Sequence, residues 1–374
     1  HRFPTGTPVL DWTVPKERNI RDAYVRDPSG RKIIDFQKSN LHVVSYSQPV
    51  NKQVSLAELL QHVITLPNHP DSCGFCASHN VVSALPEGTY VVCIDSTLTD
   101  GHLTYGEYCK PGVRDDEVLI STHICHPSLC NDNLSGIALT LMLAKLLSNV
   151  VTGYTYRFLF IPGTIGSITW LSQNRETAQR IKHGLVATCV GDDGPFRYKR
   201  SRQGDAVIDR AVLHVLKHFT DGFHDNDFSP YGYDERQYCS PGFNLAVGSL
   251  TRSSHGQYAQ YHTSADDLAF VAPENLAQSL ALYSRVIYCL EADRTYLNLN
   301  PHCEPQLGRR GLYDAIGGHH APDSFRMALL WVLNQSDGEH SLLDIAERSG
   351  IPFDVIADAG SALVGAKLLG PRAP

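Results

Sequence analysis

Residues 121–136 read STHICHPSLCNDNLSG, and the first two of them complete the apolar run Val118–Thr122. A short apolar run bounded by charged and turn residues is typical of a strand buried in a parallel sheet. The stretch then places His123, His126 and Asp132 in the segment that follows the strand. Open α/β sheets bind ligands at the carboxyl ends of their strands. The stretch therefore predicts both an α/β fold and the position of its site.

Beyond this stretch, apolar runs of strand length alternate with segments that repeat apolar residues at helical spacing. The expected order is helix 133–150, strand 156–161, helix 167–182, strand 185–190, helix 205–219, strand 243–247 and helix 273–293. Such alternation predicts βαβ units. The main domain is therefore expected to be an α/β fold with a mostly parallel twisted sheet and helices on both faces.

Two further regions have a different pattern. Residues 81–113 consist of short strand-like runs separated by turns, which predicts a small β-rich domain inserted at residues 51–113. The main α/β domain then comprises residues 1–50 and 114–303. Residues 304–374 hold three segments of helical spacing, which predicts a winged-helix-like domain. These segments are 324–333, 341–349 and 354–369.

The charge of the chain argues against nucleic acid as a partner. There are 32 basic and 39 acidic side chains, which gives a net charge of -7. Nucleic acids and anionic membranes attract clustered Lys and Arg, so neither is expected to bind. The last helical segment carries Asp354 and Asp358 but a single base, Lys367. This composition favours a protein partner for the C-terminal domain, and a role in transcription ranks last among the hypotheses.

The distribution of apolar residues and cysteines indicates the compartment. No stretch reaches the roughly 20 apolar residues of a membrane span. The first residues show no basic region followed by an apolar run, so no signal peptide is expected. The ten cysteines are then expected to be reduced thiols rather than a disulfide framework. We therefore expect a cytoplasmic protein whose partner is a small molecule or a short peptide.

Imidazole and carboxylate groups in one segment are suitable ligands for a metal ion. Zn²⁺ accepts imidazole nitrogen and carboxylate oxygen, and a carboxylate can bridge two ions through its two oxygens. Asp132 is the candidate for such a bridge. Asp132 or Asn133 could instead cap the helix that follows, as such residues often do. A cap does not explain why His123 and His126 lie in the same segment at the end of a strand.

The segment 123–136 resembles the zinc-ligand segment of the co-catalytic zinc aminopeptidases. It is more similar still to their bacterial aminopeptidase-like branch, which has a C-terminal winged helix. Other segments that carry the resemblance are 11–17, 39–47, 191–196, 234–238 and 261–267. The resemblance covers nearly the whole chain and implies a zinc exopeptidase fold with an inserted β domain.

The resemblance also implies a set of metal ligands. One of His123 and His126 is a ligand, Asp132 is the bridging ligand, Asp192 is a ligand after the next strand, and His262 is the last. Strand position favours His123, whereas closeness to Asp132 in the sequence favours His126, so the choice stays open. Asp192 could also be an ordinary turn residue in its Gly-Asp-Asp-Gly segment.

The chain departs from this family at the position of the general base. Close relatives have a Glu before a Thr-Ile-Gly-Ser run, and this chain has Gly163 there, followed by Thr164 where a second acidic ligand would be. Cys125 stands where the larger family often has an orienting Asp. Loss of a general base costs roughly 10²- to 10⁴-fold in rate. Because Thr164 stands where the second acidic ligand would be, one zinc ion is expected rather than two. Glu235 is the candidate that could act as base in place of residue 163.

Two functions follow from these observations. The first is a zinc-dependent metallohydrolase that acts on a small aminoacyl, peptidyl or amide substrate, in a biosynthetic pathway. The alternative is a catalytically impaired, metal-binding protein that acts in binding or as a scaffold, through the C-terminal domain. The motive for the alternative is Gly163.

Overall fold

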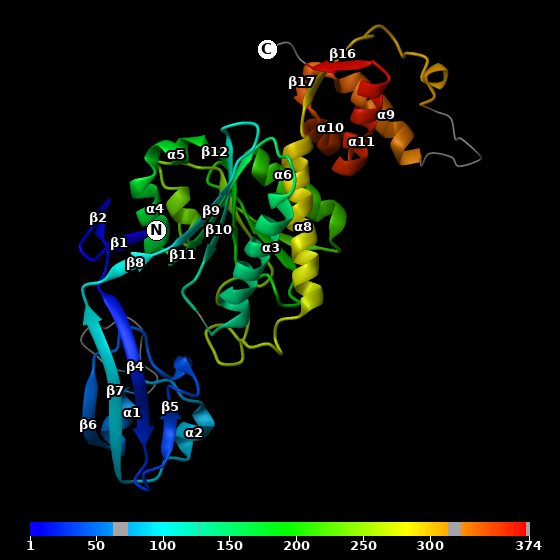
Figure 1. The fold of residues 1–374 in the computed structure, drawn as a ribbon. Helices are drawn as coiled ribbons and strands as arrows, with labels where there is room; N and C mark the ends of the chain where they lie inside the picture. Colours follow the sequence, from blue (N-terminus) through cyan, green and yellow to red (C-terminus); the bar gives the residue numbers. More distant parts are fainter. Residues whose placement is uncertain (63–73, 127, 313–322, 372–374) are drawn as a thin grey trace.

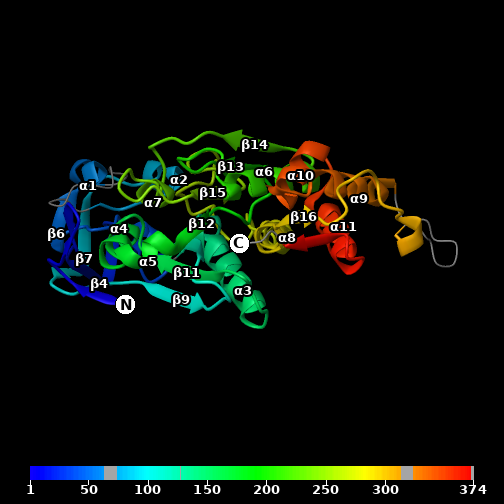
Figure 2. The same ribbon diagram turned by 90° about the horizontal axis from the view of Figure 1, so that it is seen from above.

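The computed structural model describes residues 1–62, 74–126, 128–312 and 323–371. Three units follow one another in Figure 1: a small β-rich unit, a central α/β domain and a C-terminal unit of helices with a small sheet. Seen from above, the three units lie in a row, with the α/β domain in the middle (Figure 2). Within the described residues, every helix is too short or too polar to cross a membrane.

The central domain is built on a seven-stranded sheet of order β14-β13-β15-β12-β10-β11-β9. The four strands β11, β10, β12 and β15 are neighbours and run parallel, whereas β9 and β13 pair antiparallel with β11 and β15. The strands are β9 Gly106–Lys110, β10 Glu117–His123, β11 Thr155–Ile161, β12 Ile181–Ala187, β13 Phe196–Lys199, β14 Phe223–Asn226 and β15 Val247–Thr251. The predicted α/β fold with a mostly parallel core is confirmed.

Helices cover both faces of this sheet, as the sequence predicts. Alternate side chains of β10 enter different cores: Val118 and Ile120 pack with α3, α6 and α8, whereas Leu119 packs with α4, α5 and α7. All seven residues of β10 are buried, which explains why Val118, Leu119 and Ile120 are apolar in succession rather than in alternation. The helices are α3 Gly136–Ser148, α4 Ile165–Gln173, α5 Arg175–Arg180, α6 Val207–Phe219, α7 Glu235–Tyr238 and α8 Pro273–Ala292.

The small β-rich unit is a four-stranded sheet of order β5-β4-β7-β6, with its own apolar core. Its strands are β4 Glu17–Arg26, β5 Lys32–Asp35, β6 Val50–Ser55 and β7 Thr89–Thr99, accompanied by α1 Leu56–His62 and α2 His79–Ser83. Two of these strands therefore precede residue 51, the expected start of the inserted domain. In addition, β9 lies within 51–113 but belongs to the central sheet. Strand partners distant in sequence decide these boundaries, and local patterns do not encode such pairing.

The other short strands are β1 Arg2–Pro4, β2 Pro8–Val9, β3 Trp12–Thr13 and β8 His102–Thr104. Strand β1 pairs with β8, and β2 pairs with β3. Val9 and Leu103 are buried in the core that lies under α4. The beginning of the chain therefore packs on the central domain before the small sheet starts.

The C-terminal unit contains three helices and a three-stranded antiparallel sheet of order β17-β16-β18. Its elements are β16 Thr295–Asn298, α9 Asp323–Gln335, β17 Asp337–Ser341, α10 Leu342–Ser349, α11 Phe353–Gly365 and β18 Leu369–Pro371. Strand β16 precedes the expected boundary at residue 304. Helix α10 begins with a capping box formed by Ser341 and Asp344, and ends at Gly350, whose φ is 69°.

Ion pairs and apolar contacts join this C-terminal unit to the central domain. Arg210 of α6 pairs with Asp344 and Glu347 of α10, and Arg285 of α8 pairs with Asp354 at 3.4 Å. Apolar residues of α8 and α10 belong to one continuous core. Asp354, one of the two acidic residues that favoured a protein partner for this unit, thus pairs with the central domain of the same chain.

Candidate metal centre

The four parallel strands of the central sheet end at one edge, as parallel strands must. His123 ends β10, Gly163 follows β11, Cys189 follows β12 and His255 follows β15. These residues are far apart in the sequence, and the sheet brings the loops that carry them to a single region. The candidate site of this chain is built at this edge.

The segment after β10 is held in place by side-chain hydrogen bonds to its backbone. Asp266 accepts the backbone N–H groups of Asn131 and Asp132, at 2.5 and 3.0 Å. Asn133 donates from its amide to the Thr122 hydroxyl at 2.8 Å. A Cβ at Gly136 would overlap the Asn133 side chain and the backbone of β12. The glycine therefore permits the close approach that positions Asp132.

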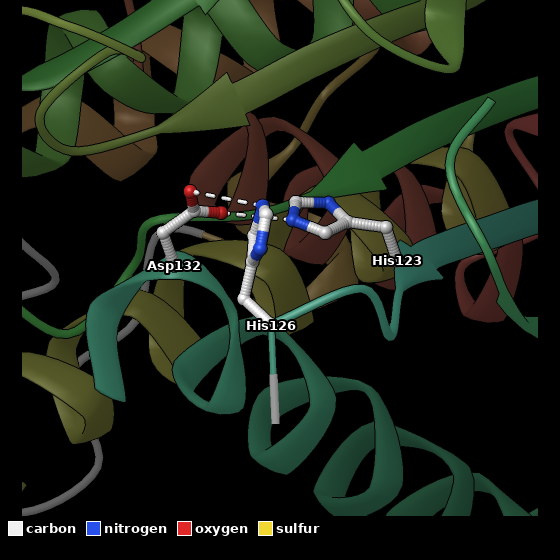
Figure 3. A group of neighbouring side chains, drawn as sticks. All are labelled: His123, His126 and Asp132. Carbon is white, nitrogen blue, oxygen red and sulfur yellow. Dashed lines mark hydrogen bonds and ion pairs between the residues drawn. The ribbon is translucent and has the colours of Figure 1, made fainter. Parts of the chain in front are cut away.

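Three imidazoles converge on the carboxylate of Asp132. The Nε2 atom of His123 lies 2.8 Å from Oδ1, and the Nε2 atoms of His262 and His126 lie 3.2 and 3.7 Å from Oδ2. Figure 3 shows His123, at the end of β10, and His126, in the loop that follows, both pointing toward Asp132. The side chains of His123 and Asp132 are 1% exposed, whereas those of His126 and His262 are 29% and 48% exposed. The site thus has a buried inner side and an open outer side.

The protonation states of these groups suit a metal ion. Burial alone would raise the pKa of Asp132, but hydrogen bonds from His123 and His262 outweigh it and hold this pKa well below its usual range. Burial lowers the pKa of His126 to about 4. At neutral pH Asp132 is therefore an anion and His126 is neutral, which are the forms that bind metals.

The donor set of this cluster fits zinc. One carboxylate and neutral imidazoles are ligands that Zn²⁺ accepts, and the donor atoms of His123, His126 and Asp132 lie within 4.8 Å of one another. The structure places both histidines against Asp132. The sequence left open which of the two histidines is the metal ligand. The structure is compatible with both belonging to one site.

Asp192 lies next to the cluster but is already satisfied by protein donors. Its Oδ1 accepts from the Ser253 hydroxyl at 2.6 Å, and its Oδ2 accepts from the Asn131 amide at 2.7 Å. Asn131 immediately precedes Asp132, so Asp192 supports the segment that carries the central carboxylate. Its role as a direct ligand stays a prediction.

Cys189 and His255 also lie at this edge, and neither was among the expected ligands. Donor atoms of Asp132, Cys189 and His255 lie within 4.8 Å of one another. Cys189 is fully buried, and burial raises the pKa of its thiol. The available signal was a cysteine at the end of the apolar run 185–190. A single cysteine predicts no ligand by itself, and the sequence indicates only that the ten cysteines are reduced thiols.

The space at Gly163 is filled by a tyrosine. A Cβ at Gly163 would overlap the ring of Tyr233. The Tyr233 hydroxyl donates to the Cys125 sulfur at 3.3 Å, and its ring centroid lies 4.4 Å from that of His123. Burial raises the pKa of Tyr233, so the phenol stays protonated at neutral pH. An aromatic ring thus occupies the volume into which an acidic side chain at residue 163 would extend.

Glu235, the candidate base, is buried at the start of α7 and paired with a lysine. Its Oε1 lies 2.8 Å from Lys199 Nζ and accepts the backbone N–H of Tyr233 at 3.2 Å. Lys199 is the last residue of β13, so this ion pair ties the start of α7 to the central sheet. The role of Glu235 as base stays a prediction.

Comparison with known proteins identifies relatives of the whole chain. Residues 1–293 match the family described as a domain of unknown function, DUF4910, and residues 294–371 match a winged helix-turn-helix family. A Clostridium acetobutylicum protein is 52% identical over 380 residues, covering 99% of this chain and 87% of that protein. Its name assigns it provisionally to polysaccharide biosynthesis and describes an aminopeptidase-like domain.

Solved structures extend this comparison to the fold. A Clostridium acetobutylicum crystal structure, provisionally described as a peptidase, is 51% identical with a TM-score of 0.93, over 99% of this chain and 87% of that chain. A zinc aminopeptidase from Bacillus subtilis is 13% identical with a TM-score of 0.53, over 77% of this chain and 84% of that chain. The second likeness concerns the fold alone. The chain belongs to the DUF4910 family, has the fold of the zinc aminopeptidases and carries a C-terminal winged helix.

Proposed function

We propose that this chain is a zinc-dependent hydrolase of a small aminoacyl, peptidyl or amide compound, and that it holds one zinc ion for this reaction. The observation that carries the proposal is the convergence of His123, His126 and His262 on the buried carboxylate of Asp132. Zinc bound there would supply Lewis-acid polarisation of the substrate carbonyl. The single ion is supported by Thr164, which stands where the family has a second acidic ligand.

The two sides of the cluster suit different tasks. His123 and Asp132 are buried and fixed by hydrogen bonds, so they serve as the anchor of the site. His126 and His262 are partly exposed, and their rings lie 4.8 Å apart. A substrate would therefore approach from their side. The name of the Clostridium acetobutylicum relative supports a substrate from a biosynthetic pathway, such as an amide carried on an amino sugar.

Proton transfer needs a group other than residue 163. Glu235 is the proposed base, because its buried carboxylate accepts the backbone N–H of Tyr233, whose ring contacts that of His123. To accept a proton, Glu235 would exchange its contact with Lys199 for one with water or substrate. The protonated Tyr233 phenol borders the same space and can donate a hydrogen bond to a bound substrate.

The test is metal content and hydrolysis measured on the same preparations. The parent is expected to hold about one zinc in the imidazole cluster and to hydrolyse at least one member of a panel of aminoacyl amides and N-acyl amino sugars. Asp132→Ala and His262→Ala should lose both properties. A zinc-loaded parent that hydrolyses nothing would contradict the proposal and support the alternative below.

The alternative function is binding without catalysis. It is favoured by two observations: the Tyr233 ring occupies the position of the family's base, and Glu235 is committed to Lys199. In that case the winged helix would present the site to a protein partner. Asp358 on α11 is exposed and, in the described part of the chain, forms no ion pair with the central domain. Its substitution by Asn should then weaken capture of that partner.

A further inference from the structure

A second group of donors shares Asp132 with the imidazole cluster. Cys189 follows β12 and His255 follows β15, and the first cluster takes no residue from the ends of these two strands. Their ligand atoms and an oxygen of Asp132 lie within 4.8 Å of one another. A carboxylate, an imidazole and a thiol thus meet at one point of the sheet edge.

The surroundings of the Cys189 thiol differ from those of a thiol in the core. The Cys239 thiol donates to the carbonyl oxygens of Leu245 and Val247, at 3.4 and 3.2 Å. The neighbours of Cys189 Sγ are the Thr188 hydroxyl, the His255 ring and the Tyr258 hydroxyl, at 3.5, 3.8 and 3.8 Å. The Cys189 sulfur therefore lies among polar groups of the site, and the His255 nitrogen beside it is a second possible metal ligand atom.

The backbone holds Cys189 in this position. Its φ is 49°, in the left-handed region that non-glycine residues seldom adopt. Its N–H donates to the side-chain oxygen of Asn133 at 3.3 Å, which links it to the residue after Asp132. Its carbonyl accepts from the N–H of Arg252 at 2.9 Å, which links it to the segment that carries His255. One connected set of hydrogen bonds therefore links the segments that carry the three possible metal ligands.

We propose that Asp132, Cys189 and His255 form a second cation position, for a thiophilic divalent ion such as Zn²⁺ or Co²⁺. Sulfur selects zinc and cobalt over magnesium and calcium. Binding forms a metal–sulfur bond and releases the thiol proton to solvent, so one proton leaves for each ion bound. The inference rests on the proposed function only in that both positions use Asp132.

Cobalt titration of the metal-free full chain tests this position directly. Thiolate bound to Co²⁺ gives a near-ultraviolet sulfur-to-cobalt charge-transfer band, whereas imidazole and carboxylate give only the weaker visible bands. The parent should show both kinds of band and bind about two cobalt ions. Cys189→Ser should lose the charge-transfer band, keep the visible bands and bind about one ion. His255→Ala should weaken the second binding event without removing the first.

Two cysteine variants serve as matched controls. Cys125→Ser removes a thiol near the imidazole cluster, and Cys239→Ser removes a buried thiol elsewhere in the core; both should keep the band. Circular dichroism and thermal unfolding check that each variant is folded. If Cys189→Ser fails to fold, the sulfur shell in X-ray absorption of the cobalt-loaded parent, together with His255→Ala, decides the question.

The outcomes separate this inference from the proposed function. Visible bands without a charge-transfer band in the parent would overturn the second position and leave the imidazole site standing. A band lost in Cys125→Ser but kept in Cys189→Ser would also overturn it. Absence of any bound cobalt would overturn both proposals.

Discussion

Strand β10 ends at His123, and its neighbour β11 ends at Ile161, the residue paired with His123 in the sheet. The two loops that follow touch, since the Gly163 N–H donates to the Cys125 sulfur at 2.8 Å. The segment after β10 carries His126 and Asp132, which with His123 could hold a metal ion. The loop after β11 has Gly163 where the resemblance to the zinc aminopeptidases implies a general base, and the ring of Tyr233 fills the space. The two neighbouring loops therefore differ in the ligand atoms that they could offer a metal ion.

Removal of the central carboxylate is expected to have the largest effect. Asp132→Ala leaves three imidazoles without the anion on which they converge, so zinc affinity should fall by more than about 100-fold. Isothermal titration of the metal-free protein measures this loss. Asp193→Ala, which removes an exposed carboxylate nearby, is the matched control and should bind zinc as the parent does. If Asp132→Ala binds zinc as tightly as the parent, the segment after β10 does not hold the metal as proposed.

Loss of the proposed base should have the next largest effect. Glu235→Gln keeps the shape of the side chain but cannot accept a proton, so kcat should fall by roughly 10²- to 10⁴-fold at unchanged zinc content. Lys199→Met removes the cation but keeps the carboxylate, and separates catalysis from the ion pair. If both variants lose the same activity, Glu235 acts through structure and the chain takes its base from elsewhere.

An acidic residue restored at position 163 tests whether the loop after β11 can supply a base. Gly163→Glu alone should destabilise the protein by about 1–3 kcal/mol, because its side chain would overlap Tyr233. Gly163→Glu combined with Tyr233→Ala should recover part of this stability and raise hydrolysis about tenfold over Tyr233→Ala alone. Thermal unfolding and the amide panel measure the two effects. A stable single variant would show that Tyr233 does not decide which residue stands at 163.

The smallest expected effect concerns a second carboxylate on the β11 side. Burial raises the pKa of Asp234 to about 7. Its Oδ1 accepts from Ser167 at 2.7 Å, and its Oδ2 has no partner among the described residues. Between about pH 4 and pH 7 the folded chain holds a proton that the unfolded chain has lost, so stability falls as the pH rises through this range.

Asp234→Asn removes this titration. The free energy of unfolding of the parent, relative to that of Asp234→Asn, should fall by about 2–4 kcal/mol between pH 4 and pH 8. Urea unfolding at a series of pH values measures the difference, and Asp193→Asn is a control with an exposed carboxylate. A parent and variant with parallel pH profiles would show that Asp234 is ionised in the folded chain.

Much of the site could be predicted from its local pattern. His123, His126 and Asp132 lie within ten residues at the end of one apolar run, so chain order alone predicts that they meet. His262 was placed by the resemblance of its segment, and the structure brings its ring to 3.2 Å from Asp132. Asp192 lies nearby through Asn131, but its oxygens are occupied by protein donors.

The sequence by itself determined the alternation of strands and helices, the edge of the sheet that carries the site, and the absence of an acid at residue 163. These properties depend on short-range periodicity and on the identity of single residues. Only the tertiary structure decided that β4 pairs with β7, that Tyr233 fills the space at Gly163, and that Cys189 and His255 join Asp132. Each of these depends on contacts between segments distant in the chain, whose pairing is set by packing of the whole core rather than by any local pattern.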